Sequence, residues 1–375
     1  MQPIQMVDTK NQYLKIKTEI DEAIQQVLNS AQYINGKVVH QFSENLGNYL
    51  QANFVVPCAN GTDALQIALM ALDLQPGDEI ITPSFTYIAT VEVIALLQLK
   101  PVFVDVNPIT FCIDENLIEA NITNKTKAII PVHLFGQAAN MEKIMHIAQK
   151  YNLYVIEDNA QSIGAEVIYS GGEIKKTGTI GHIGTTSFYP SKNLGCFGDG
   201  GAMTTNDANL AEKLKMIANH GQSKRYYHDI VGCNSRLDSI QAAVLNIKLN
   251  YINEYTATRN KVANYYNTQF KEIVQFMLPE KSVYSTHVYN QYTIQLKNID
   301  RNSFIEFLAS NNIPTMIYYP VAAHQQKMMQ KWSTQIYNLP ITEKLCNSVI
   351  SLPIHTEMNE EQLQYISTKI KEFLN

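Results

Sequence analysis

Short apolar segments separated by helical ones constrain the fold of this chain more than any other feature. Residues 128–132 and 154–156 are apolar along nearly their whole length, as expected for strands of a parallel sheet that helices cover on both faces. Further short β-type runs lie at 79–82, 101–106, 184–189 and 201–205, and helical patterns lie at 88–97, 115–120 and 141–150. We therefore expect an α/β unit with a large, mainly parallel sheet.

The regions flanking this alternation predict helices and a second, smaller unit. Apolar positions at helical spacing between residues 13 and 50 indicate an opening helical pair, and a long helical pattern runs from Asp238 towards Tyr266. Beyond it the pattern predicts strands and helices of an α+β unit, at 291–296, 303–310, 314–318 and 360–373. Since 375 residues exceed a usual single core, we expect a large domain over 1–255 and a small C-terminal domain over 256–375.

Composition excludes several classes of function. The net charge is −5 and the sequence pI about 6.0, which argues against nucleic acid and anionic membranes as partners. The five cysteines are scattered and form no CxxC pair, so we expect a reducing compartment and neither disulfides nor a metal site. No long apolar run and no basic-then-apolar leader is visible, which favours a cytoplasmic protein.

Polar residues follow the predicted strands where ligands of such sheets bind. Gly61 and Thr62 form a turn before a helix, which is a potential anion site. Tyr87 follows the next strand, and Asp158 and Gln161 follow the strand at 153–157. The strand at 184–189 leads through Ser187 to Lys192 and a glycine-rich loop at 195–201. An anion cradle, an aromatic ring, a carboxylate and a lysine should thus meet at one edge of the sheet.

This combination matches the needs of pyridoxal phosphate, which takes a Schiff-base lysine, an acid at its ring nitrogen, a flat ring partner and phosphate donors. Lys192, Asp158 and Tyr87 fill the first three roles, and Gly61, Thr62 and Ser187 fill the fourth. Each residue also has an ordinary structural reading: Asp158 as a helix cap, Tyr87 as core, Lys192 as a solvated side chain. Their occurrence together at successive strand ends favours the cofactor.

With these residues in place, the chain resembles the fold-type I pyridoxal-phosphate aminotransferases of the DegT/DnrJ/EryC1/StrS family, which act on nucleotide-linked keto sugars. The resemblance extends over nearly the whole chain and rests on ordered motifs at 60–65, 76–79, 131–137, 157–161, 187–192, 220–222, 234–238 and 241–243. It implies a large domain built on a seven-stranded type of sheet and a smaller C-terminal α+β domain.

The resemblance also assigns roles. Lys192 and Asp158 are catalytic, and Gln161 bonds the ring hydroxyl of pyridoxal 5'-phosphate. Asn234 would reach the phosphate of a neighbouring subunit, which implies a homodimer with shared active sites. Arg236 would face the partner's substrate. Further substrate contacts are expected from Arg225 and His228 and from Tyr319 and His324.

For substrate preference, the resemblance rests on two segments. The loop at 193–201 and the segment at 225–228 look like the branch that aminates C3 of UDP-2-acetamido-2-deoxy-3-oxo-glucuronate or of dTDP-3-oxo-6-deoxyhexoses, and the nucleotide stays open between UDP and dTDP. One departure lies in the sugar pocket. Where the family often has Tyr-Pro-x-Pro-Leu-His, residues 319–324 read Tyr-Pro-Val-Ala-Ala-His.

The expected reaction moves an amino group from L-glutamate, which becomes 2-oxoglutarate, through pyridoxamine 5'-phosphate to the keto carbon of the sugar. The amino sugar would serve cell-surface polysaccharide or glycoconjugate synthesis. Two alternatives remain at this point. One is another reaction on the same cofactor, such as sugar dehydration, although related dehydratases carry a histidine in place of Lys192. The other is a regulatory protein that binds the cofactor without turnover.

Overall fold

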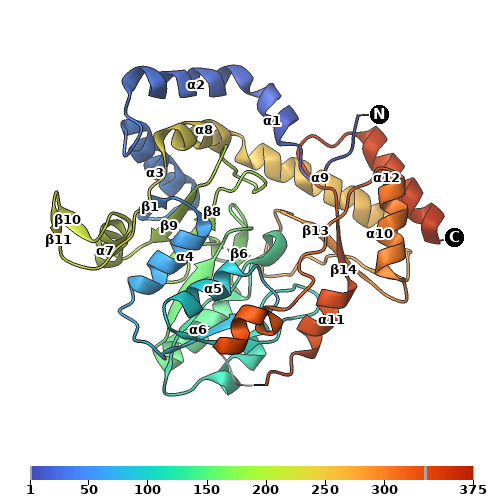
Figure 1. Cartoon of the computed structure of the whole chain (residues 1–375). Coiled ribbons are helices and arrows are strands. Elements are labelled where there is room, and N and C mark those ends of the chain that lie inside the picture. Colours follow the sequence, from blue (N-terminus) through green and yellow to red (C-terminus); the bar gives the residue numbers. More distant parts are fainter. Residues whose placement is uncertain (1, 333–335, 375) are drawn as a thin grey trace.

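A seven-stranded sheet forms the centre of the computed structural model, which describes residues 2–332 and 336–374 (Figure 1). The strand order is β1-β9-β8-β5-β4-β2-β3. The strands are β1 (Phe54–Cys58), β2 (Glu79–Pro83), β3 (Lys100–Val104), β4 (Thr126–Ile129), β5 (Tyr154–Asp158), β8 (Ile183–Ser187) and β9 (Gly201–Thr205). Strand β9 pairs antiparallel with β8 and β1, and the other pairings are parallel. The predicted mainly parallel sheet is confirmed.

Both faces of the sheet are covered by buried side chains. Adjacent residues of a strand point to opposite faces, so the cluster to which each belongs shows what covers its face. Ile80 and Ile130 belong to one buried cluster, and Ile81 and Ile129 belong to another. Helices α4 (Gly61–Met70), α5 (Ala89–Leu96) and α7 (Ala208–Ala218) contribute to the first cluster, and α6 (Met141–Tyr151) contributes to the second. The continuous apolar runs of the sequence thus reflect burial on both faces.

The N-terminal helices differ from the predicted pair. The structure has α1 (Thr9–Lys15), α2 (Lys17–Ser30) and α3 (Lys37–Leu50). Helices α2 and α3 pack on α8 (Ser239–Asn250). The long helical pattern after Asp238 is also divided: α8 ends near Tyr251, and α9 (Ile252–Phe270) continues to the C-terminal unit (Figure 1). Helical periodicity does not reveal such breaks, because both halves keep an apolar face.

The C-terminal unit packs around a small antiparallel sheet, ordered β12-β13-β14. Its elements are β12 (Phe276–Met277), β13 (Tyr292–Leu296), α10 (Arg301–Ser310), α11 (Pro340–Ser348), β14 (Val349–Leu352) and α12 (Glu360–Leu374). The predicted strand at 314–318 is wrong: a single bridge joins Met316 to Ser351 there. The predicted domain boundary at residue 255 falls inside α9, and the two-domain division stays a prediction.

Short elements complete the described residues. The predicted helix at 115–120 is replaced by two 3₁₀ turns, η1 (Glu115–Leu117) and η2 (Glu119–Asn121). The other short elements are η3 (Leu134–Gly136), η4 (Ala323–Gln325), η5 (Lys327–Lys331), β6 (Glu166–Ile168), β7 (Ile174–Lys176), β10 (Gln222–Lys224) and β11 (Tyr227–His228). Among the helices of the described ranges, none is long and apolar enough to cross a membrane.

Candidate functional site

A cavity of about 860 Å³ lies at the carboxyl ends of the parallel strands. Eight of the residues predicted for the site line it: Gly61, Thr62, Tyr87, Asp158, Gln161, Ser187, Lys192 and Tyr319. They come from segments more than 250 residues apart in the sequence. The topology therefore brings the predicted cofactor residues of this chain together around one cavity.

One wall of the cavity is the beginning of α4. The helix starts at Gly61, and the side chain of Asn60 caps it by accepting a hydrogen bond from Asp63 N at 2.8 Å. A Cβ atom on Gly61 would lie 2.7 Å from Cβ of Ser187, so only glycine permits this close approach of α4 to the end of β8. Unpaired N–H groups of a helix start beside two hydroxyl side chains suit the phosphate of the predicted cofactor.

Asp158 ends β5 and is almost completely buried at the cavity. Its Oδ2 accepts a hydrogen bond from Oγ1 of Thr90 at 2.8 Å, and its Oδ1 accepts one from Ala160 N at 3.2 Å. Burial raises the pKa of this carboxyl, although both donors and the charge of Lys192 oppose the rise. A protonated ring nitrogen placed against Asp158 would favour the charged form, so the residue fits its predicted role.

Lys192 lies in the loop after β8 and is half-buried. Its Nζ makes no hydrogen bond or ion pair within the part of the chain that the structure describes. Burial lowers the pKa of this amine to about 8, and the nearby charge of Asp158 limits the fall. An amine that is partly neutral near physiological pH is a suitable nucleophile for a Schiff base.

Gln161 and Tyr319 form a hydrogen-bond chain whose direction is set by the backbone. Phe135 N donates to Oε1 of Gln161 at 2.7 Å, so its Nε2 is the atom that donates to the Tyr319 hydroxyl at 3.0 Å. One amide hydrogen and the hydroxyl proton of Tyr319 are left for a ligand in the cavity that both residues line. Burial raises the pKa of Tyr319, which keeps that proton in place. Tyr87, which is 58% exposed, also lines the cavity, and its ring centroid lies 6.1 Å from that of Tyr319.

Two positioning contacts were not predicted from the sequence. Glu157, next to Asp158 but directed to the other face of β5, bonds His133 Nε2 at 2.8 Å and accepts from the N–H groups of residues 178, 180 and 181. Burial opposes ionisation of Glu157, yet these donors hold its pKa below the usual value. The adjacent acids Glu157 and Asp158 were the available signal, since strand alternation sends such neighbours to opposite faces.

The second unpredicted contact is made by Lys248 of α8, which is 2% exposed. Its Nζ donates to the carbonyl oxygen of Gly195 at 2.6 Å and thereby holds the loop that follows Lys192. Burial lowers the pKa of Lys248 to about 8. A lysine at a helical position looks like a surface residue in the sequence, so nothing there distinguished it.

Five predicted residues lie outside the lining of this cavity: Asn234, Arg236, Arg225, His228 and His324. The Arg236 side chain donates to Oδ1 of Asn219 at 3.0 Å. Arg225 and His228 belong to the exposed β10–β11 hairpin, which projects from the edge of the molecule (Figure 1). His324 Nδ1 lies 2.7 Å from Ser84 Oγ, and its Nε2 lies 3.5 Å from Glu343. The roles of these five residues stay predictions.

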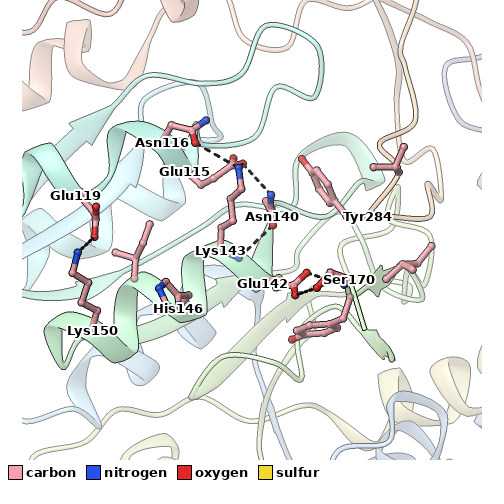
Figure 2. A pocket seen from close by; sticks show the side chains of 14 residues that line it. Glu115, Asn116, Glu119, Asn140, Glu142, Lys143, His146, Lys150, Ser170 and Tyr284 are labelled. Atoms are coloured by element: carbon pink, nitrogen blue, oxygen red, sulfur yellow. Dashed lines mark hydrogen bonds and ion pairs between the residues drawn. The ribbon is translucent and has the colours of Figure 1, made fainter. Parts of the chain in front are cut away.

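A second hollow, of about 850 Å³, lies on the outer side of α6 (Figure 2). Its charged side chains pair with one another: Lys150 with Glu119 at 2.8 Å, and Lys143 with Glu115 at 3.1 Å. Glu142 bonds the backbone and hydroxyl of Ser170. None of the predicted site residues lines this hollow.

Comparison with known proteins gives a consistent result. The model of the DegT/DnrJ/EryC1/StrS aminotransferase family matches residues 14–371. The UDP-2-acetamido-2-deoxy-3-oxo-D-glucuronate aminotransferase of Pseudomonas aeruginosa is 45% identical, over 97% of this chain and 98% of that protein. A "pleiotropic regulatory protein" of Geobacillus stearothermophilus is 43% identical over 99% and 98%. The UDP-N-acetyl-3-dehydro-alpha-D-glucosamine 3-aminotransferase of Acidithiobacillus ferrooxidans is 41% identical over 99% and 98%.

Solved structures agree with this match. DesV of S. venezuelae, in complex with a ketimine intermediate, has a TM-score of 0.94 and 34% sequence identity, covering 100% of this chain and 99% of that one. The similarity of fold spans both the large sheet and the C-terminal unit. Together with the family match, it confirms the predicted fold class and the predicted pyridoxal phosphate cofactor.

Proposed function

This chain belongs to the DegT/DnrJ/EryC1/StrS aminotransferase family, and we propose that it transfers the amino group of L-glutamate to C3 of a nucleotide-linked 3-oxo sugar. The observation that carries the proposal is the meeting of Lys192 and Asp158 in one cavity beside the start of α4. When bound, pyridoxal phosphate supplies a carbonyl that carries the amino group and a ring that accepts electrons.

The residues of the chain then have distinct tasks. Gly61, Thr62 and Ser187 would bind the phosphate and so fix the orientation of the ring. Asp158 would keep the ring nitrogen protonated. Lys192 Nζ would anchor the cofactor and act as the base that takes the proton from Cα of the amino donor; in the second half of the reaction it would deliver a proton to the sugar carbon.

Reaction at C3 is supported by two relatives of more than 40% identity. Their names describe a 3-oxo sugar in one case and a 3-dehydro sugar in the other, and both sugars are linked to UDP. The loop at 193–201 resembles the same branch. A UDP-linked sugar is therefore the first substrate to test, with the dTDP-linked analogue beside it.

We also infer that the active unit is a homodimer. Among the described residues of the cavity lining, Asp63, Asp158 and Asp199 face a single cation, Lys192. The proposed ligands carry negative phosphate, diphosphate and carboxylate groups. Binding them would therefore need more positive charge than the site of one chain contains. Arg236, which lies outside the cavity of its own chain, would supply it from a second copy, together with the amide of Asn234.

The test is mass-spectrometric detection of amino-sugar product from a panel of UDP- and dTDP-linked 3-oxo and 4-oxo sugars, with L-glutamate as donor. We expect product from a 3-oxo substrate and an equal amount of 2-oxoglutarate. Product from 4-oxo sugars alone would contradict the proposed position, and an unsaturated or deoxygenated product would indicate dehydration.

A regulatory role is the second candidate, because the Geobacillus stearothermophilus relative bears that name. A cofactor-binding regulator needs the phosphate and ring contacts but not the proton transfers of Lys192. Loss of the visible absorption band on addition of L-glutamate would favour the enzyme. A band that persists, with no product from any sugar of the panel, would favour the regulator.

Shared sites have a separate test. Lys192→Ala and Arg236→Ala chains, each expected to be inactive alone, are unfolded together, refolded and assayed. Recovery of part of the wild-type activity is expected, since one of the two sites in a mixed dimer then receives no altered residue. No recovery, with dimers present by light scattering, would contradict the sharing of Arg236.

A further inference from the structure

Thr90 contacts the proposed ring-nitrogen partner but belongs to no motif that pointed to the site. It is the second residue of α5, fully buried, and its Oγ1 lies 2.8 Å from Oδ2 of Asp158. The hydroxyl of Thr86, four residues earlier and lining the cavity, lies 3.1 Å from Oγ1 of Thr90. Two threonine hydroxyls and the carboxylate therefore form a buried row.

Each hydroxyl has one hydrogen to donate, which sets the direction of the hydrogen bonds along this row. The Thr90 hydroxyl has one hydrogen and three possible acceptors: Oδ2 of Asp158 at 2.8 Å, Oγ1 of Thr86 at 3.1 Å and the carbonyl oxygen of Tyr87 at 3.2 Å. The shorter distance and the charge both favour the carboxylate. Thr86 then donates to Thr90, so the chain runs from Thr86 through Thr90 to Asp158.

The surroundings of Asp158 show why this donor matters. Burial raises the pKa of the carboxyl, and the hydrogen bond from Thr90 is the largest single interaction that lowers it again. The hydrogen bond from Ala160 N and the charges of Lys192 and His133 also lower the pKa of Asp158. Tyr319 also lines the cavity, and because burial raises its pKa it stays protonated and adds no charge. Thr90 also places Asp158 beside the first turn of α5, where a negative charge is favourable.

We propose that Thr90 is a positioning residue: its hydroxyl, supported by Thr86, holds the Asp158 carboxylate ionised and oriented for the ring nitrogen of pyridoxal phosphate. The inference rests on the cofactor and not on the identity of the sugar. It assigns to an apparently ordinary buried threonine the task of keeping an acid charged in an apolar place.

Thr90→Val tests this, because valine has the same shape without the hydroxyl. Full-length protein freed of cofactor is titrated with pyridoxal phosphate at several pH values, and binding is followed by absorbance. We expect the dissociation constant to rise roughly tenfold near neutral pH. Without its donor, Asp158 takes up a proton at higher pH, so the acidic limit of binding should move upwards by about one pH unit.

Two further variants separate positioning from packing. Thr90→Ser keeps a hydroxyl and should retain the pH profile of the wild type. Thr82→Val is the matched control, since Thr82 is equally buried but donates to the neutral carbonyl of Ile130 at 3.1 Å. It should lower the midpoint of thermal unfolding without moving the acidic limit of cofactor binding.

The outcomes distinguish the possibilities. A Thr90→Val protein with unchanged affinity and unchanged pH profile overturns the proposal, as does a profile that Thr82→Val shifts equally. If Thr90→Val does not fold, Thr90→Cys replaces it, because a thiol is a weak donor of similar size and should shift the profile in the same direction. Failure of every sugar substrate would contradict the proposed function but would leave these binding measurements interpretable.

Discussion

Two hollows of nearly the same size occur in this molecule, and they differ in how their charged groups are partnered. The hollow beside α6 has three acids and two lysines, and the lysines are paired with acids at its rim (Figure 2). In the cavity at the strand ends, Lys192 has no hydrogen-bond partner among the described residues, and Asp158 is buried without a paired cation. Exposed ion pairs contribute little and leave nothing for a ligand.

The difference teaches that charged groups without an oppositely charged partner, and not volume, identify the site. Placing the charged groups of Asp158 and Lys192 in partly apolar surroundings costs free energy. A bound cofactor with a cationic ring and a reactive carbonyl can offset this cost. The paired hollow offers no such gain. The following variants test this contrast, from the largest expected effect to the smallest.

Lys192→Ala should abolish amino transfer, because the chain then has neither the anchor nor the base at the reacting carbon. The matched change in the other hollow, Lys143→Ala, should leave the steady-state rate at the wild-type level. Product formation from L-glutamate and the active sugar is the measurement for both. Turnover by the Lys192→Ala protein would end the assignment of this residue.

Asp158→Asn should fold but react about a hundredfold or more slowly, since an amide cannot pair ionically with a protonated ring nitrogen. Glu142→Gln, in the hollow beside α6, is the corresponding control and should have no effect on kcat. Circular dichroism establishes that both proteins are folded. An Asp158→Asn enzyme of normal rate would instead support a purely structural role of Asp158, through its bonds to Thr90 and Ala160.

Gly61→Ala should weaken binding of pyridoxal phosphate about tenfold, because the added Cβ would lie 2.7 Å from Cβ of Ser187 and force α4 away from β8. At Gly171 a Cβ would meet no atom within 4 Å. Gly171→Ala should therefore bind the cofactor as the wild type does. Equal affinities of the two variants would show that the phosphate is held elsewhere.

The two hollows should also differ in the titration of their lysines. Burial lowers the pKa of Lys192 to about 8, whereas the hydrogen bond from Lys150 to Glu119 raises the pKa of Lys150. In protein freed of cofactor, the reactivity of Lys192 towards a trace acylating reagent should reach half of its maximum near pH 8, and that of Lys150 only at a pH above the midpoint of ordinary lysines. Peptide mass spectrometry after labelling at each pH gives both midpoints, and coincident midpoints would contradict the contrast.

The smallest effect is expected from Glu119→Gln, which removes the partner of Lys150 on an exposed surface. The rate of amino transfer should not change, and the melting temperature should move by only about 1 °C. A large loss of activity would show that the hollow beside α6 contributes to function.

Much of the site could be predicted because it depends on local sequence. Strand ends, the turn before α4 and the segment from Ser187 to Lys192 are each visible within a few residues, and parallel topology brings their ends together. Thr90 and Lys248 could not be predicted in this way. Each lies at an unremarkable helical position, and its role comes from a contact with a residue 68 or 53 positions away.

The sequence by itself determined the α/β architecture, the cofactor and the residues that would hold it, because apolar periodicity and strand-end motifs are local properties of the chain. Only the tertiary structure decided how those residues are charged and directed. It divided the long helical pattern after Asp238 at Tyr251, paired Glu157 with His133, and placed Arg236 outside the cavity of its own chain. Burial and hydrogen-bond partners arise from segments distant in sequence, and therefore from packing alone.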